Sequence, residues 1–218
     1  MEHPRHQIVL ITNAQVEAAG KLLAQAFFSD PLMVTIFSDD QERIGVLTWY
    51  YTTLVRSLST VQGVYTTDDL VKGVAVWDPP GTLEEAPVWT EPFGGQSYRR
   101  LLKAIDFLTP FRQAELSGPY WYLSWIGVAP AYRGQKLGSA LLAPVLRQAD
   151  QAGLPCYLET FDQNNLFFYQ PHGFEVVYAE TEPESNVPFW ALKREPHSHA
   201  GMGEGTGIRL PEHPSKMG

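Results

Sequence analysis

A short basic turn between an apolar strand and an apolar helix is the part of this sequence best suited to chemistry. The turn runs from Tyr132 to Gly138 and carries Arg133 and Lys136 beside two glycines. Residues 120–128, before it, are aromatic and β-branched as in a buried strand, and the residues after it repeat an apolar side chain at helical spacing. The first N–H groups of a helix lack intrahelical partners, and the helix dipole favours negative charge there. We therefore expect this turn to bind a phosphate or pyrophosphate.

Two common phosphate-binding loops do not match the turn. A nucleotide-triphosphate loop has four residues between its glycines, followed by Lys and Ser/Thr. Only three residues separate Gly134 from Gly138, and Ser139 follows directly. A dinucleotide-binding turn needs the spacing Gly-x-Gly-x-x-Gly, which this segment lacks. The pattern therefore indicates a different kind of pyrophosphate ligand.

A second group of spaced residues follows the next expected strand. Residues 154–160 form the short apolar run that predicts this strand. Asn165 comes after it, Tyr169 lies four residues later, and the pair Gly173-Phe174 follows the tyrosine. Two such groups in this order, each preceded by a strand, are the most specific feature of the sequence.

Together these groups resemble the signatures of the GCN5-related N-acetyltransferase (GNAT) family. Its acetyl-coenzyme A loop is usually written Arg/Gln-x-x-Gly-x-Gly/Ala, and here Arg133 takes the first position and Gly138 the last. Lys136 departs from this pattern, because the family usually has Gly there. Its amide can still donate if its φ and ψ are ordinary, and its side chain adds a charge for phosphate. The resemblance covers residues 119–194 and is strongest to puromycin N-acetyltransferase and its relatives.

The resemblance implies both a fold and a reaction. The fold is the α/β (α+β) acyl-CoA N-acyltransferase fold, a mixed, mostly antiparallel sheet of about seven strands flanked by helices. A splayed strand pair opens this sheet at the cofactor site. The implied enzyme moves the acetyl group of acetyl-CoA, its co-substrate, to a primary amine of a small molecule. The competing interpretation is a catalytically inactive CoA-binding domain acting as a sensor or assembly module; Tyr169 favours the enzyme, and Lys136 mildly favours altered cofactor binding.

The resemblance also assigns residues to the cofactor. The pantetheine arm pairs with the strand before the turn like an added strand, and the pyrophosphate binds the turn. The expected cofactor-binding residues are Ile126, Gly127, Val128, Arg133, Gly134, Gln135, Lys136, Leu137, Gly138, Ser139 and Asn165. Arg133 and Lys136 could instead be solvated surface charges, and Asn165 a helix N-cap. A side chain at Gly138 is expected to fill the space that the backbone leaves for the pyrophosphate.

Tyr169 and Glu159 are the candidate catalytic residues. By resemblance, the Tyr169 hydroxyl points at the thioester sulfur and protonates the departing coenzyme A; the alternative is a ring that only packs beside Phe167 and Phe168. Glu159 lies near the C-terminal end of its strand, where a partly buried carboxylate has a raised pKa and can accept a proton. A purely structural role for Glu159 is nearly as well supported by the sequence.

Other reactive side chains receive plainer interpretations. Cys156 falls in the middle of a strand and is expected to be core filler rather than a nucleophile. His172 has no partner at ligand spacing, and the histidines of the tail at 196–218 are expected to be solvated. We therefore expect no metal site. Trp89, in the Pro/Gly-rich loop 78–96, is the aromatic residue best placed to wall a substrate pocket, while the other aromatic residues are more often core.

The chain length and the net charge limit the number of domains and the kinds of partner that we expect. The 218 residues suit one domain, expected at 1–195, followed by a Gly/Pro/His-rich tail. A net charge of −8 argues against nucleic acid as the main partner. No long apolar run or signal peptide is present, and the single cysteine fits a reducing compartment, so we expect a cytoplasmic monomer or homodimer without membrane contact.

Periodicity and turn residues predict the order of the elements. Strands are expected at 7–11, 61–66, 70–77, 120–128, 154–160, 176–179 and 187–193, and helices from Asn13 and at 40–60, 97–117 and 137–152. Two prolines fall inside expected helices. We expect Pro110 to interrupt the third helix and Pro144 to bend the fourth.

Overall fold

A seven-stranded mixed sheet forms the centre of the molecule, as expected from the resemblance. The computed structural model describes residues 6–68, 70–82 and 96–197. The strands are β1 (Ile8–Leu10), β2 (Val64–Thr67), β3 (Gly73–Asp78), β4 (Trp121–Val128), β5 (Cys156–Thr160), β6 (Glu175–Glu182) and β7 (Val187–Arg194). Their order in the sheet is β1-β2-β3-β4-β5-β7-β6. Only the β4–β5 pair is parallel, and the other neighbouring pairs are antiparallel.

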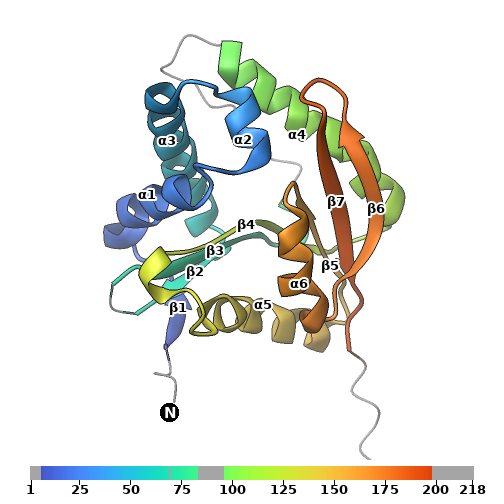
Figure 1. The fold of residues 1–218 in the computed structure, drawn as a ribbon. Coiled ribbons are helices and arrows are strands. Elements are labelled where there is room, and N and C mark those ends of the chain that lie inside the picture. The colour runs from blue at the N-terminus through green and yellow to red at the C-terminus, as the bar shows by residue number, and fades with distance from the viewer. Residues whose placement is uncertain (1–5, 69, 83–95, 198–218) are drawn as a thin grey trace, which may run out of the picture.

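Helices cover both faces of the sheet (Figure 1). They are α1 (Val16–Ala26), α2 (Pro31–Ile36), α3 (Asp40–Ser59), α4 (Gln96–Glu115), α5 (Leu137–Ala152) and α6 (Leu166–Tyr169). α1 and α3 contact one face, α5 contacts the other, and α4 contacts β6. Two large apolar cores result, one beneath α1 and α3 and one between α5 and the sheet. No helix within the described residues combines the length and apolarity needed to cross a bilayer.

The apolar face of α5 holds the helix against the sheet. Leu137, Leu141, Val145 and Ala149 repeat at a spacing of four and are all buried, as their periodicity predicted. Gly153 ends the helix in the left-handed conformation, with φ of 66°. The sequence therefore fixes the direction of α5, whose N-terminus faces the end of β4.

β4 and β5 part after a short common stretch. They pair only at Trp121 with Cys156 and at Tyr122 with Tyr157. Beyond this point β4 stays paired with β3, while β5 stays paired with β7. The predicted splayed pair is therefore confirmed. It leaves one edge of β4 without a strand partner in the described structure.

A β-bulge in β4 lies beside this opening. Val76 faces Trp125 but the next residue, Trp77, faces Leu123, so Ser124 is the extra residue of β4. The bulge reverses the side-chain alternation, and Leu123 packs in the α5 core while Trp125 packs against the opposite core. Sequence alternation alone would have put both residues on the same face.

Some expected boundaries were wrong. Asn13 does not cap α1, because a single 3-10 turn at Asn13–Gln15 precedes the helix. Thr12 is the N-cap of that turn, and Gln15 is the N-cap of α1. α4 runs through Pro110 without interruption, since a proline removes only one N–H and the packing of Leu108 and its neighbours holds the helix in place. Trp89 and the tail from residue 198 lie outside the described residues.

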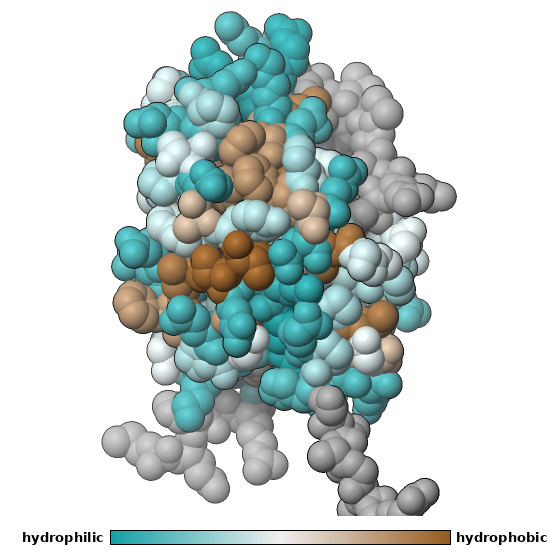
Figure 2. Space-filling model, turned by 90° about the vertical axis from the view of Figure 1, so that its right-hand side faces the viewer, coloured by the Kyte–Doolittle hydropathy of each residue, from teal (hydrophilic) through white to brown (hydrophobic). Residues whose placement is uncertain are grey.

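The face of the molecule that carries the outer strand β6 is largely hydrophilic, with apolar side chains in small groups (Figure 2). β6 is an edge strand with Glu175, Glu180 and Glu182 along it, and several of its side chains are exposed. Charged edges of this kind discourage pairing with other chains. The edge of β4 that opens away from β5, by contrast, is free within the described structure to pair with a ligand.

Candidate functional site

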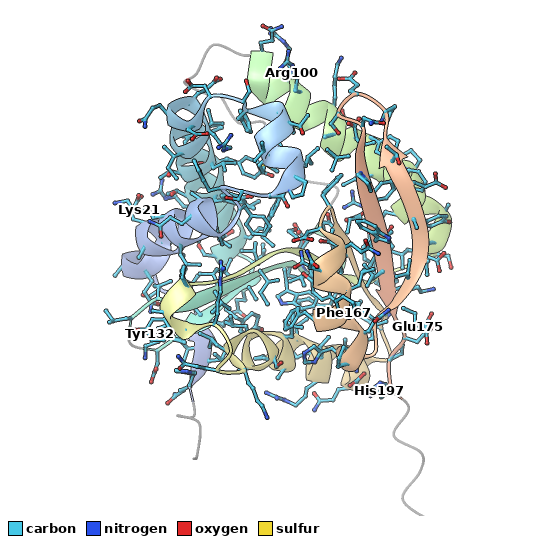
Figure 3. The ribbon with its side chains drawn as sticks, viewed as in Figure 1. Lys21, Arg100, Tyr132, Phe167, Glu175 and His197 are labelled. Carbon is cyan, nitrogen blue, oxygen red and sulfur yellow. The ribbon has the colours of Figure 1, made fainter. Side chains whose placement is uncertain are left out.

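A cavity of about 740 Å³ occupies the opening between β4 and β5. Every residue expected to bind the cofactor lines it except Gln135, and so do both expected catalytic residues, Glu159 and Tyr169. In Figure 3, Tyr132 marks the loop that follows β4, and Phe167 marks α6, which follows β5. Gln135 instead turns its side-chain amide to the carbonyl of Ala131, at 3.0 Å. The structure thus brings the two sequence motifs to one cavity.

The loop before α5 presents a row of free backbone donors. Gly134 has φ of 73° and Lys136 has φ of 60°, so two positions with left-handed backbone curl the loop. Among the described residues, Arg133 N bonds Pro130 O and Ala140 N bonds Lys136 O, but no N–H from Gly134 to Ser139 has a carbonyl partner. Such a curl at a helix N-terminus makes a concave anion site.

The conformation of Lys136 differs from the sequence expectation, which required an ordinary φ and ψ. Its left-handed backbone is the one that Gly adopts without cost, which explains the usual Gly at this position of the family loop. The side chain is exposed beside the cavity. Arg133 is exposed as well, and its Nε donates to the carbonyl of Val128 at 3.2 Å. The two cations therefore flank the free donors.

Gly138 lies at the cavity and also against an aromatic ring. A Cβ on Gly138 would lie 3.0 Å from Cζ of Phe168 and 3.1 Å from its Cε2. Phe168 in turn packs on Tyr169 and His172, with ring centroids 5.1 and 5.3 Å apart. A side chain at this position would therefore press on Phe168, which adds a second constraint to the space expected for the pyrophosphate.

Ser139 has a partner that the sequence did not reveal. Its hydroxyl oxygen lies 3.0 Å from Nε2 of His172. Burial, with the nearby charge of Arg194, lowers the pKa of His172, so the ring is neutral at pH 7. The neutral ring holds the Ser139 hydroxyl at the first turn of α5. The only sequence signal for this contact is that His172 directly precedes the Gly-Phe pair.

Asn165 lines the cavity at the start of α6. Its Nδ2 donates to Oγ1 of Thr160 at 2.9 Å, and its side chain makes no capping bond to α6. Asn165 therefore occupies the N-cap position of α6 but makes no capping bond there. Its side chain is instead held across the gap between β5 and α6, and the residue lines the cavity.

Tyr169 is buried where α6 meets the cavity. Its residue surface is 6 % exposed, and its ring packs between Phe168 and Phe174. Burial raises the pKa of its hydroxyl above the ordinary value of 10.0, because a phenolate would be poorly solvated there. The hydroxyl thus keeps its proton throughout the physiological range.

Glu159 is a buried carboxylate at the far side of the cavity. Its side chain is 2 % exposed, and neither oxygen has a hydrogen-bond partner of normal geometry among the described residues. Nε of Arg112 lies 4.0 Å from Oε1. Burial raises the pKa of Glu159 to about 7, although Arg112 and the Tyr122 hydroxyl favour the ionised form. A carboxyl group with this pKa can both take and release a proton near neutral pH.

Two further polar groups at this end were missed by the sequence reasoning. The guanidinium of Arg112, from α4, lies 4.4 Å above the ring of Tyr122. Ser124, the extra residue of the bulge, donates a hydrogen bond to Asp78 Oδ2. Burial raises the pKa of Asp78, while this hydrogen bond lowers it. Sequence gave no signal for either group, because each depends on the packing of α4 or on the bulge.

Asp30 is a third carboxylate at the cavity. It caps α2, and its Oδ1 accepts from Leu32 N at 3.0 Å and from Met33 N at 3.2 Å. Its sequence signal is the dipeptide Asp30-Pro31, an N-cap residue followed by a proline at the first helical position. Nearby, Trp125 packs on Phe27 with ring centroids 4.9 Å apart, so this end of the cavity is aromatic as well as acidic.

The described residues hold no group of three or more His, Cys, Asp or Glu side chains placed to bind a metal ion. Cys156 is buried, and burial raises the pKa of its thiol to about 12. A thiol with that pKa stays protonated and is a poor nucleophile. Tyr169, the carboxylates and the free backbone donors are the candidate reactive groups of the cavity.

Comparison with known proteins identifies the family. The model of the acetyltransferase (GNAT) family matches residues 99–174, which include the loop before α5, Glu159 and Tyr169. The chain belongs to the GNAT family. It is an acetyltransferase, and GNAT enzymes generally use acetyl-CoA.

Relatives share the fold over most of the chain. An uncharacterised N-acetyltransferase of Schizosaccharomyces pombe is 25 % identical over 203 residues, which cover 84 % of this chain and 80 % of that protein. A structure from Corynebacterium glutamicum, described as histone acetyltransferase HPA2 and related acetyltransferase, has 20 % identity and a TM-score of 0.64 over 90 % of this chain and 99 % of its own. A putative arylalkylamine N-acetyltransferase 7 of the mosquito Aedes aegypti has 14 % identity and a TM-score of 0.65 over 87 % of each chain.

Proposed function

We propose that this GNAT protein transfers the acetyl group of acetyl-CoA to a primary amine of a small molecule. One observation carries the proposal: a single cavity joins the free donors of the α5 loop, the open edge of β4, the buried phenol of Tyr169 and the buried carboxylate of Glu159. The loop suits a pyrophosphate, and the open strand edge suits the amides of pantetheine. The solved relative named as an arylalkylamine acetyltransferase supports an amine as acceptor.

The reaction can then be followed through the residues of the cavity. Glu159, in its ionised form, removes a proton from the amine directly or through water, and the amine nitrogen attacks the thioester carbonyl. An N–H at the open edge of β4 stabilises the negative oxygen that develops. The C–S bond breaks as Tyr169 gives its proton to the departing sulfur, so the products are an amide and the free thiol of coenzyme A. Arg112, whose Nε lies 4.0 Å from Oε1 of Glu159, helps to position this carboxylate.

The alternative function is a catalytically inactive CoA-binding sensor or assembly module. Such a protein would need the loop but not two ionisable groups with raised pKa facing the same cavity. Release of the thiol from acetyl-CoA, measured against a panel of small amines, separates the two functions. We expect amine-dependent release with at least one member. Tight binding of coenzyme A without any amine-dependent release would favour the sensor.

Replacing Lys136 with Gly is expected to raise the melting temperature by about 2 °C and to weaken the salt dependence of acetyl-CoA binding. The left-handed backbone costs a non-Gly residue about 1 kcal/mol of folding free energy, which Gly would not incur. Part of this gain is lost, because Gly makes the unfolded chain more flexible and so raises the entropy cost of folding. The lysine charge adds an ionic contact to phosphate, which salt screens. Differential scanning calorimetry and titration calorimetry at low and high salt measure the two effects.

Two matched variants separate the effect of the left-handed backbone on stability from the effect of the lysine charge on binding. Gln62 also has a left-handed backbone, with φ of 59°, and does not line the cavity, so Gln62→Gly should stabilise the fold without changing binding. Lys136→Ala should lower the salt dependence without the gain in stability. Absence of acetyl-CoA binding to the wild-type protein at low salt would contradict the proposed cofactor site.

A further inference from the structure

The two ends of the cavity carry opposite charges. Arg133 and Lys136, on the α5 loop, are the cationic side chains among its described lining residues. The other end is lined by the carboxylates of Asp30, Glu159 and Asp162. If the loop end holds the phosphates of the cofactor, as in the proposed function, the acidic end is left for the acceptor. Its charge suits a molecule with more than one positive group.

Asp30 and Asp162 reach this end from separate segments of the chain. Asp30 lies between α1 and α2, and Asp162 lies between β5 and α6. Asp162 Oδ1 accepts from the backbone N and from Nδ2 of Asn164, both at 2.9 Å, just as Asp30 Oδ1 accepts from its own helix start. Within the described residues no hydrogen bond reaches Oδ2 of either carboxylate. Each group is therefore oriented by its cap and keeps one oxygen for a ligand.

The charge of Asp162 acts on Asp30. Burial raises the pKa of Asp30 to about 6, against the hydrogen bonds from Met33 and Leu32, and the negative charge of Asp162 adds to this rise. The described structure shows no cation paired with either group. A positive group placed between them would relieve their repulsion and would be partly shielded from solvent.

Glu159 lines the same cavity, and neither of its oxygens has a hydrogen-bond partner of normal geometry among the described residues. The lining of the cavity also includes the apolar side chains of Phe27, Met33 and Phe161. The cavity thus offers one negative group at the proposed reaction point, a second negative pair and apolar surface. An alkyl chain with an amino group at each end has the complementary pattern.

We propose that the acceptor is an aliphatic diamine, whose reacting amine lies at Glu159 while its second ammonium group binds between Asp30 and Asp162. The proposal rests on the proposed function and deepens it. Asp30 and Asp162 are then specificity-determining residues that recognise the part of the substrate that does not react. A neutral or purely apolar amine would leave this pair without a counter-ion.

Asparagine variants isolate this role, because Asn caps a helix about as well as Asp but carries no charge. In the wild-type protein we expect kcat/KM for 1,4-diaminobutane to exceed that for n-butylamine, which has the same chain without the second amine. Asp30→Asn and Asp162→Asn should each lower kcat/KM for the diamine by roughly 10–100-fold, mainly through KM, and leave the value for butylamine nearly unchanged. Asp39→Asn is the matched control, since Asp39 caps α3 in the same way outside the cavity lining.

The possible outcomes separate this proposal from the proposed function. Equal kcat/KM for the two amines in the wild type, or equal losses for both in Asp30→Asn, would overturn the subsite while leaving the acetyltransferase reaction in place. If the wild type acetylates neither amine, titration calorimetry of 1,4-diaminobutane in the presence of coenzyme A decides. Binding that Asp30→Asn abolishes would support the subsite, and absence of binding would overturn it.

Discussion

Replacing Tyr169 with Phe is expected to lower the turnover number by roughly 10²–10⁴-fold, the usual contribution of a positioned acid. The variant keeps the ring that packs between Phe168 and Phe174 and removes only the hydroxyl. The affinity for acetyl-CoA should therefore hardly change. Steady-state turnover, with cofactor binding measured separately by calorimetry, tests this expectation.

The pH profile adds a second readout for Tyr169. The acid must be protonated to act, and burial raises its pKa above 10.0, so wild-type turnover should persist into strongly alkaline solution. Tyr65→Phe is the control, because it removes a hydroxyl that accepts from Gln148 and does not line the cavity. Near wild-type turnover in Tyr169→Phe would end the acid assignment, although the transfer reaction could still use water as its proton source.

Replacing Glu159 with Gln is expected to lower turnover by roughly 10²–10³-fold and to flatten the acid side of its pH profile. A general base works only when ionised. With a pKa of about 7, turnover of the wild type should rise as the pH increases through 7. Gln has nearly the same shape but cannot take the proton. The pH dependence of kcat in the two proteins, with one amine substrate, measures the difference.

A matched control for Glu159 is Glu182, a buried glutamate on β6 outside the cavity lining. Its carboxylate accepts from the amides of Glu184 and Ser185, so Glu182→Gln should affect stability rather than turnover. If Glu159 is only structural, Glu159→Gln should behave like this control. An unchanged acid limb in Glu159→Gln would assign the base to another group.

Features of the fold that depend on local pattern were predictable. The spacing of Leu137, Leu141 and Val145 defined the buried face of α5, and the turn before it was recognised from its glycines and basic residues. The order of the two motifs, through the family resemblance, also predicted that β4 and β5 part. Local propensity predicted helix ends and interruptions less reliably. α1 does not begin at Asn13, and α4 continues through Pro110, because tertiary packing stabilises a helix that local propensity would end.

The candidate site was predictable only in part. Tyr169, Glu159 and the loop residues were expected, and all but Gln135 line one cavity. Arg112 beside Glu159, His172 beside Ser139 and Asp162 near Asp30 were not expected. Each of these pairs joins residues from separate elements, and no period or spacing in the sequence records such a distance.

By itself, the sequence determined the strand-loop-helix unit that presents free N–H donors, since backbone geometry and helix ends follow from neighbouring residues. Local patterns also determined the succession of strands along the chain. Only the tertiary structure decided the acidity of the site. The bulge at Ser124 turns Trp125 to the side of the sheet that α1 covers. The packing of α4 brings Arg112, which is distant in sequence, beside the buried Glu159. Burial and charge at a point in space depend on all the elements that meet there, which a linear pattern does not encode.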